Sequence, residues 1–233
     1  MSDLFRNVRL HWHRLRGTRE VILDGIRLGS GPDQSMAVRN GLYKGNYEAA
    51  ERDLLKRHLK PGTRVLEIGG GIGFVGLLAA SIAGPGNVLT YEANPLLETA
   101  IRANHARNAV APDLRMRAIT TDGAPVTFHQ SDNVISSSIY DRVEAERKIE
   151  VQSDAFANAV SDWRADMVVM DVEGYEIDLL ATPPEGPTQL LVELHPHVVG
   201  EDRIGSMLDH LIEQGFEITE QQHKNLLLTR RAA

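Results

Sequence analysis

The sequence of 233 residues contains no cysteine. This excludes disulfide bonds, metal sites built on thiolates and a cysteine nucleophile, and it fits a reducing compartment. The sequence also lacks an apolar run near the ~20 residues that a membrane-spanning helix needs. Its first twenty residues lack the continuous apolar core of a signal peptide. We therefore expect a soluble, cytoplasmic protein without a membrane span.

An excess of positive charge is missing as well. The formal net charge is −7 and the pI is about 5.7, which argues against a protein that binds nucleic acid by neutralising its phosphates. The length suits one sizeable α/β domain rather than two. We expect residues 61–233 to form this domain and residues 1–60 to form an N-terminal helix, hairpin and cap segment.

The first twenty residues differ in charge from the rest of the chain, with five arginines against two acidic residues. Leu4, Val8, Trp12 and Leu15 recur at helical spacing, which predicts an amphipathic helix with a basic face. Such a helix could lie on an anionic surface. We expect it instead to pack on the acidic body of its own chain or on a second subunit, which would make a homo-oligomer.

Predicted strands and helices alternate along the chain. The predicted strands lie at 64–68, 88–92, 114–119, 126–129, 148–152, 167–171, 189–195, 216–219 and 225–229, and the predicted helices at 48–59, 74–83, 94–108, 154–163 and 204–212. The Asp24-Gly25 dipeptide predicts a hairpin within Val21–Leu28, and residues 29–46 are expected to be an irregular loop. This alternation predicts a mostly parallel sheet flanked by helices, with right-handed crossovers.

The most informative segment is Val65-Leu66-Glu67-Ile68-Gly69-Gly70-Gly71-Ile72-Gly73, an apolar run that ends in a glycine cluster. With the apolar helical stretch at 74–83 behind it, the run predicts a buried strand that turns tightly into a helix. Glycine lets a ligand approach the backbone closely, and the helix N-terminus offers free N–H groups to it. We expect a nucleotide-like cofactor at this turn.

The acids around the turn favour one cofactor. The stretch 71–76 also fits the GxGxxG pattern of dinucleotide-binding proteins. The carboxylate of Glu67 would repel a pyrophosphate but suits the ammonium and sulfonium of S-adenosylmethionine. Glu92 ends the next strand, 19 residues after Gly73, where an acid takes the ribose hydroxyls of either cofactor type. We therefore predict S-adenosylmethionine, with the binding residues Glu67, Gly69, Gly71, Gly73, Glu92, Ala93, Ile119 and Asp171.

Two side chains at the carboxyl ends of later strands are candidates for catalysis. Asp171 and His195 should meet at the same sheet edge as the glycine turn, because the strands are parallel. Either could take the proton of a hydroxyl nucleophile, and the ordinary pKa of histidine near 6.5 suits that role. Asp171 could instead orient the amino group of the cofactor.

A metal site is the second interpretation of the same edge. Asp171, Glu193, His195 and His197 offer carboxylate and imidazole groups that divalent ions accept. His-x-His on an extended segment would point both rings to the same side. We rank this below a site without metal.

Three carboxylates follow the strand at 167–171 in the string Asp171-Val172-Glu173-Gly174-Tyr175-Glu176. This string, the glycine motif, Tyr91-Glu92-Ala93-Asn94-Pro95 and Glu193-Leu194-His195 resemble the FkbM-like methyltransferases, over the stretch from about Tyr47 to His195. The family usually has aspartate at Glu67, often a small residue and asparagine at Gly70 and Ile72, and commonly lysine at Val169. The resemblance implies a class I methyltransferase fold, which is Rossmann-like, with S-adenosylmethionine as cofactor.

The resemblance also implies O-methylation of a hydroxyl on a small molecule, such as a sugar or a secondary metabolite. We expect segments 41–48 and 131–147 to form substrate loops, with the substrate-binding residues Tyr47, Glu48, Ser137 and Glu173. Two other functions stay open, an NAD-dependent oxidoreductase and a non-catalytic nucleoside-binding subunit.

Overall fold

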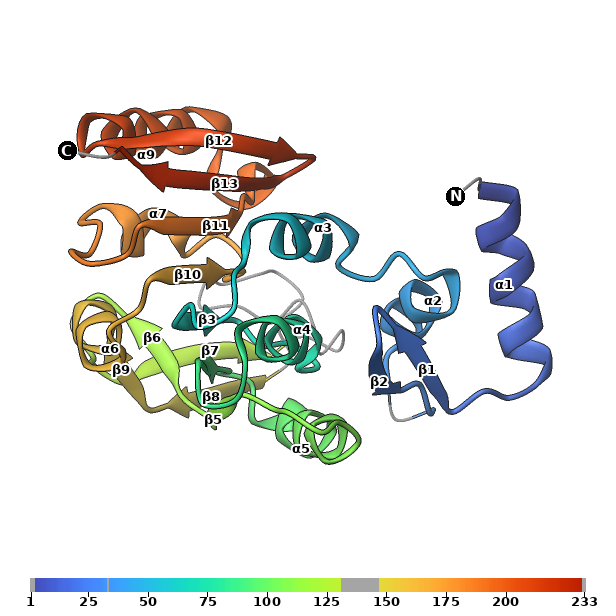
Figure 1. The fold of residues 1–233 in the computed structure, drawn as a ribbon. Coiled ribbons are helices and arrows are strands. Elements are labelled where there is room, and N and C mark those ends of the chain that lie inside the picture. The colour runs from blue at the N-terminus through green and yellow to red at the C-terminus, as the bar shows by residue number, and fades with distance from the viewer. Residues whose placement is uncertain (1–2, 33, 131–146, 232–233) are drawn as a thin grey trace.

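The computed structural model describes residues 3–32, 34–130 and 147–231. Among these residues a seven-stranded sheet has the order β12-β13-β11-β10-β3-β4-β5 (Figure 1). Its strands are β3 (Val65–Ile68), β4 (Val88–Tyr91), β5 (Asp113–Arg115), β10 (Met167–Met170), β11 (Gln189–Glu193), β12 (Phe216–Gln222) and β13 (Asn225–Arg230). β13 runs antiparallel to both of its neighbours, whereas β5, β4, β3, β10 and β11 are parallel. The predicted, mostly parallel sheet is confirmed.

Helices cover both faces of the sheet. They are α3 (Ala49–His58), α4 (Phe74–Ala83), η1 (Pro95–Leu97), α5 (Glu98–Ala106), α6 (Phe156–Trp163), α7 (Glu176–Leu180), α8 (Pro196–Val199) and α9 (Glu201–Glu213). Neighbouring strand residues point to opposite faces: Val65 and Val169 pack with α3 and α4, while Leu66 and Val168 pack with α6, α7 and α9. Strands buried on both faces explain why these segments are apolar throughout.

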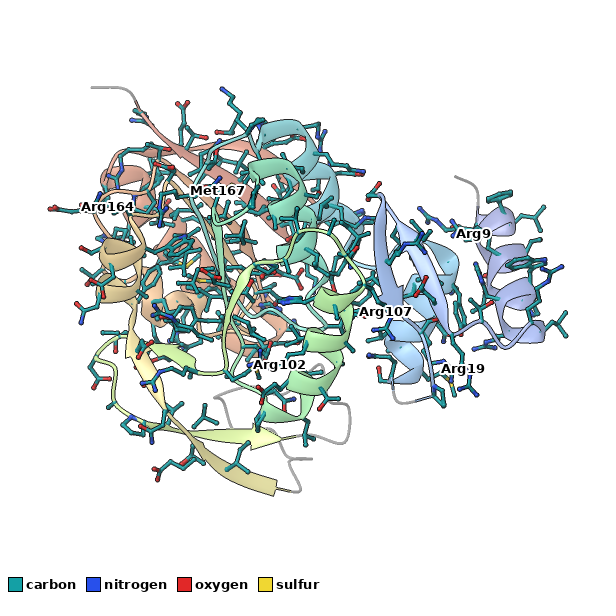
Figure 2. The ribbon with its side chains drawn as sticks, turned by 60° about the horizontal axis from the view of Figure 1, so that its bottom comes forward. Arg9, Arg19, Arg102, Arg107, Arg164 and Met167 are labelled. Carbon is teal, nitrogen blue, oxygen red and sulfur yellow. The ribbon has the colours of Figure 1, made fainter. Side chains whose placement is uncertain are left out.

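The N-terminal part consists of α1 (Asp3–Leu15), β1 (Glu20–Leu23), β2 (Ile26–Gly29) and α2 (Met36–Lys44). It lies to one side of the sheet, with its hairpin against α4 and α5 (Figures 1 and 2). The hairpin turns at Asp24 and Gly25, both at positive φ, as predicted.

The expectation of an irregular loop over residues 29–46 is wrong for half of that range, because α2 spans residues 36–44. The Ser35 side chain accepts a hydrogen bond from the Val38 amide and caps the helix. Gly45 ends it at φ 77°. Leu42 and Tyr43 bury its inner face.

The predicted amphipathic helix at the N-terminus is confirmed as α1, but only one of its faces is covered. Leu10 is buried and contacts α2. The other face carries exposed apolar side chains: Leu4, Phe5, Val8, Trp12 and Leu15. The helix thus packs on its own chain through α2, as expected, but not through these apolar side chains, and a second subunit stays a prediction.

Two further differences concern element ends. The strand expected at 114–119 is two strands, because Arg117 pairs with Asp154 and draws β6 (Ala118–Thr120) to β9 (Ser153–Ala155). The helix expected from 154 begins at Phe156. β7 (Val126–Gln130) and β8 (Arg147–Val151) pair antiparallel as predicted. In the described part of the chain, no helix combines the length and the apolar character that crossing a bilayer demands.

Candidate functional site

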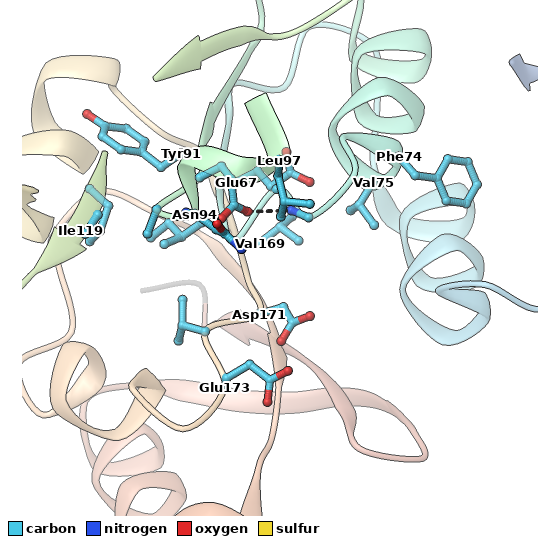
Figure 3. Close-up of a pocket in the computed structure, with 18 of the residues that line it drawn as sticks. Glu67, Phe74, Val75, Tyr91, Asn94, Leu97, Ile119, Val169, Asp171 and Glu173 are labelled. Carbon is cyan, nitrogen blue, oxygen red and sulfur yellow. Dashed lines mark hydrogen bonds between the residues drawn. The ribbon is translucent and has the colours of Figure 1, made fainter. Parts of the chain in front are cut away.

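A pocket opens at the carboxyl ends of β3, β4 and β10, where the strand order reverses between β3 and β10. Ligands of open α/β sheets bind at such a switch point. The cavity measures about 980 Å³, counting the part open to solvent. In Figure 3, Asp171 and Glu173 lie next to each other on one side of it.

The glycine turn after β3 has the backbone that the sequence predicts. Gly69, Gly71 and Gly73 have φ values of 91°, 54° and 82°, a region that favours glycine. A side chain at Gly69 would meet the backbone carbonyl of Asp171, so the turns after β3 and β10 touch. Gly73 begins α4 and faces Ile101 rather than the pocket.

Glu92 follows β4 and holds the glycine turn. Its Oε2 accepts a hydrogen bond from the Gly71 amide at 2.8 Å, and its Oε1 accepts one from the Asn94 amide at 2.7 Å. Burial raises the pKa of Glu92 to about 7, although these amides favour the charged form. The side chain lines the pocket, so its carboxylate can accept further hydrogen bonds from a ligand.

Glu67 lies within β3 and also lines the pocket. The Thr90 hydroxyl donates a hydrogen bond to its Oε2. Its Oε1 is buried and has no hydrogen-bond partner among the described residues. Burial raises the pKa of Glu67 to about 7. An unsatisfied buried oxygen calls for a partner, and a cationic donor would satisfy it.

A cluster of acidic side chains borders the pocket next to β10 and β11. His195 Nε2 lies 3.4 Å from Asp171 Oδ1, 3.4 Å from Glu193 Oε1 and 3.8 Å from Glu173 Oε2. Its Nδ1 lies 3.3 Å from Glu176 Oε1. The parallel strands thus bring the predicted residues Asp171 and His195 to one edge.

The two candidate bases have different environments. Burial, together with the charges of Glu193 and Glu48, holds the pKa of Asp171 well above its usual range. Burial opposes the charged form of His195, but the carboxylates of Glu176 and Glu193 outweigh it and raise the pKa of His195 to about 10. His195 is 1% exposed and lies behind Asp171, which lines the pocket. The role of His195 as a base stays a prediction.

Glu176 joins the turn after β10 to the end of β11. Its Oε1 accepts a hydrogen bond from the His195 amide at 2.9 Å, and its Oε2 accepts one from the Gly174 amide at 2.8 Å. It is fully buried. We did not predict it as a site residue, although it is the third acid of the string after β10.

The start of α3 closes the acidic side of the pocket. The predicted residues Tyr47 and Glu48 line it, together with Glu51, which is 3% exposed. Burial raises the pKa of Glu51 well above its usual range, and the charge of Glu48 adds to this shift. Glu51 is not among the predicted site residues, although Glu48 and Glu51 are three residues apart at the start of one helix.

Of the other predicted residues, Ala93 and Ile119 line the pocket, as does Glu173. Ser137 lies outside the described residues. His197 is exposed, because Pro196 starts α8 and the segment is not extended. The rings of His195 and His197 lie close, with 5.8 Å between their centroids, but the segment is not the extended one that was expected, and the donor group of Asp171, Glu193 and His195 does not include His197.

Solved structures with this arrangement include two methyltransferases of similar size. The ribosomal protein L11 methylase of Lactobacillus delbrueckii subsp. bulgaricus is 16% identical, with a TM-score of 0.52 over 87% of this chain and 84% of that chain. A methyltransferase from Pyrococcus furiosus is 14% identical, with a TM-score of 0.51 over 96% and 97%. The fold is that of the class I methyltransferases.

A third structure with this fold contains a ligand. The Pyrococcus abyssi tRNA (uracil-54, C5)-methyltransferase, in complex with S-adenosyl-L-homocysteine, is 15% identical. Its TM-score is 0.50 over 92% of this chain and 44% of that chain. At such identities the likeness shows the fold alone. No known family model and no curated protein matches the sequence.

Proposed function

We propose that this protein is an S-adenosylmethionine-dependent methyltransferase, similar to the FkbM-like enzymes, that methylates a hydroxyl of a small molecule. One observation carries the proposal. Two buried carboxylates, Glu67 and Glu92, flank the glycine turn in a single pocket, and one of them has an oxygen without a partner.

The residues present fit this cofactor. The oxygens of Glu92 accept hydrogen bonds from backbone amides, and a carboxylate keeps further acceptor capacity for a ribose hydroxyl. The free Oε1 of Glu67 suits the ammonium of the methionine part. Ala93 and Ile119 give apolar surface for the adenine. A pyrophosphate would instead meet uncompensated carboxylates, which disfavours a nicotinamide coenzyme.

The bound cofactor supplies a methyl group that its sulfonium already activates. The protein has to hold the acceptor oxygen in line with that group and to exclude water. Asp171 lines the pocket, so its carboxylate is placed to take the acceptor's proton. His195 lies behind Asp171 and balances its charge, which makes it a positioning residue.

The walls of the pocket favour a small acceptor without phosphates. Glu48, Glu51 and Glu173 line the acceptor side, and the net charge of the chain is −7. Like charges repel a polyanion, so we do not extend the tRNA substrate of the Pyrococcus abyssi enzyme to this protein. Carboxylates do accept hydrogen bonds from sugar hydroxyls.

A substrate screen tests the proposal. Purified protein is incubated with S-adenosylmethionine and a panel of sugars and hydroxylated secondary metabolites, and formation of S-adenosylhomocysteine is measured. Turnover with at least one acceptor, abolished in Glu92→Ala, is the expected result. Cofactor binding without turnover on any acceptor favours a non-catalytic nucleoside-binding subunit. Turnover of NADH with a carbonyl substrate favours an oxidoreductase.

A further inference from the structure

Three side chains beside the pocket form a compact set of groups that can bind a metal ion, and one of them, Asp171, lines the pocket. One donor atom each from Asp171, Glu193 and His195 lies within 4.8 Å of the other two. His195 Nε2 is 3.4 Å from an oxygen of each acid. This is longer than the most common length of an N–H···O hydrogen bond, about 2.9–3.0 Å. It matches the ~3.0–3.5 Å between neighbouring donors around a cation with bonds of about 2.1 Å.

A second observation points to a ligand between these atoms. Asp171 Oδ1 is buried and has no hydrogen-bond partner in the part of the chain that the structure describes. Its hydration is compensated only by the ring of His195 at 3.4 Å, beyond the usual length of a hydrogen bond. A cation beside it would provide that compensation.

The histidine is held as metal-binding histidines are. His195 is 1% exposed, and its Nδ1 faces Glu176 Oε1 at 3.3 Å. A carboxylate on one ring nitrogen fixes the tautomer that presents the other nitrogen to a metal. Glu176 is itself fixed by the Gly174 amide. The ring therefore presents Nε2 to Asp171 and Glu193 in one orientation, and a bound cation would take the place of the proton on Nε2.

We infer that Asp171, Glu193 and His195 bind a divalent cation. Two carboxylates and one imidazole form a mixed donor set that suits Mn²⁺, since carboxylates favour the harder ions and imidazole the later transition metals. The cation lies at the acceptor end, where it would hold an acceptor through its oxygen. This last role rests on the proposed function, whereas the binding itself does not.

A second group of acids offers a weaker alternative. Glu48, Glu51 and Glu193 also lie within 4.8 Å of one another. Glu48 and Glu51, however, share a hydrogen bond, so their oxygens already have partners. The group also lacks a nitrogen donor. The set around His195 is therefore the better site.

Lys224 would compete with a bound cation for the carboxylate of Glu193. Its ammonium contacts Glu193 Oε1, and its side chain is 53% exposed. A long, exposed side chain can withdraw into water at small cost. A cation that binds Glu193 must displace this ammonium, so removal of Lys224 should tighten binding. A merely structural cluster predicts no such gain.

The test uses the full chain, stripped with a chelator and titrated with Mn²⁺ alone by calorimetry and electron paramagnetic resonance. One equivalent should bind. Asp171→Asn and Glu193→Gln should each weaken binding at least tenfold, and Lys224→Met should tighten it severalfold. Glu213→Gln, which removes an equal charge from an exposed position of α9, should leave it unchanged.

Absence of Mn²⁺ binding by the wild-type protein, or equal affinities in all variants, would overturn the inference. If the Asp171 and Glu193 variants do not fold, the response of Lys224→Met decides alone, and an unchanged affinity contradicts the site. S-adenosylhomocysteine binding is measured in the presence of chelator. If S-adenosylhomocysteine binds normally in chelator and Mn²⁺ does not bind at all, the cation site is rejected and the proposed function still stands.

Discussion

The carboxylate of Glu92 and the amide of Gly71 are joined by a 2.8 Å hydrogen bond. The bond links the turns after two adjacent strands, β3 and β4. It fixes the glycine turn before any ligand arrives, which reduces the entropy lost on binding. Glu92 therefore both shapes the pocket and faces the ligand.

Replacement of Glu92 by alanine should weaken binding of S-adenosylhomocysteine about 10- to 100-fold, because a hydrogen bond to a charged group contributes about 1.5–3 kcal/mol. Isothermal calorimetry gives the dissociation constants. Glu98→Ala is the matched control, since Glu98 is an exposed acid on α5 that pairs with Arg102. Equal affinities of the two variants would remove Glu92 from the ribose site.

Two glycines of the turn should respond differently to alanine. At Gly69 a Cβ would collide with the Asp171 backbone, so Gly69→Ala should lose on the order of 3 kcal/mol of unfolding free energy or not fold. At Gly71 the space is open apart from the Tyr47 hydroxyl. Gly71→Ala should lose about 1–2 kcal/mol through its positive φ and should weaken cofactor binding. Chemical denaturation and calorimetry separate the two effects; equal stabilities would contradict the packing of the two turns.

The stability of the chelated protein should fall as the pH rises from 6.5 towards 10. The pKa of His195 is raised to about 10 in the folded protein, whereas the ordinary pKa of histidine, which applies to the unfolded chain, is 6.5. The charged imidazolium therefore stabilises the fold fully below pH 6.5, and this contribution is lost as His195 deprotonates. His195→Gln should show a flatter profile of melting temperature over this range. Parallel profiles for the two proteins would show that His195 is not charged in the fold.

Cofactor affinity should depend on pH in the opposite direction. Burial raises the pKa of Glu67 and of Glu92 to about 7, and both must be ionised to accept hydrogen bonds from the cofactor. Binding of S-adenosylhomocysteine should therefore weaken below pH 7, by up to about tenfold per pH unit for each proton taken up. Glu92→Ala should show a shallower dependence. A flat wild-type profile between pH 5.5 and 8 speaks against both contacts.

Features that depend on neighbouring residues could be predicted from the sequence. The turn at Asp24-Gly25 and the strand–glycine–helix passage at 65–83 each need only local backbone preferences. The placement of Glu92 and Asp171 at one edge follows because parallel strands end on the same side.

Features that depend on contacts between distant segments could not be predicted from the sequence. Glu51 reaches the site because α3 packs over the sheet, and Lys224 reaches it from the turn between β12 and β13. No local sequence pattern indicates that Glu51 or Lys224 lies at the site. Helix α2 was missed because a glycine inside it, Gly41, weakens the helical signal, although that glycine packs closely on Tyr47. The extended backbone expected around His197 was wrong because Pro196 begins α8.

The most direct test is a calorimetric titration of the wild-type protein with S-adenosylhomocysteine and, separately, with NADH. Because Glu67 and Glu92 lie beside the glycine turn, the protein should bind S-adenosylhomocysteine with one-to-one stoichiometry. NADH should give no heat of binding. Clean binding of NADH without a response to S-adenosylhomocysteine would contradict a methyltransferase site.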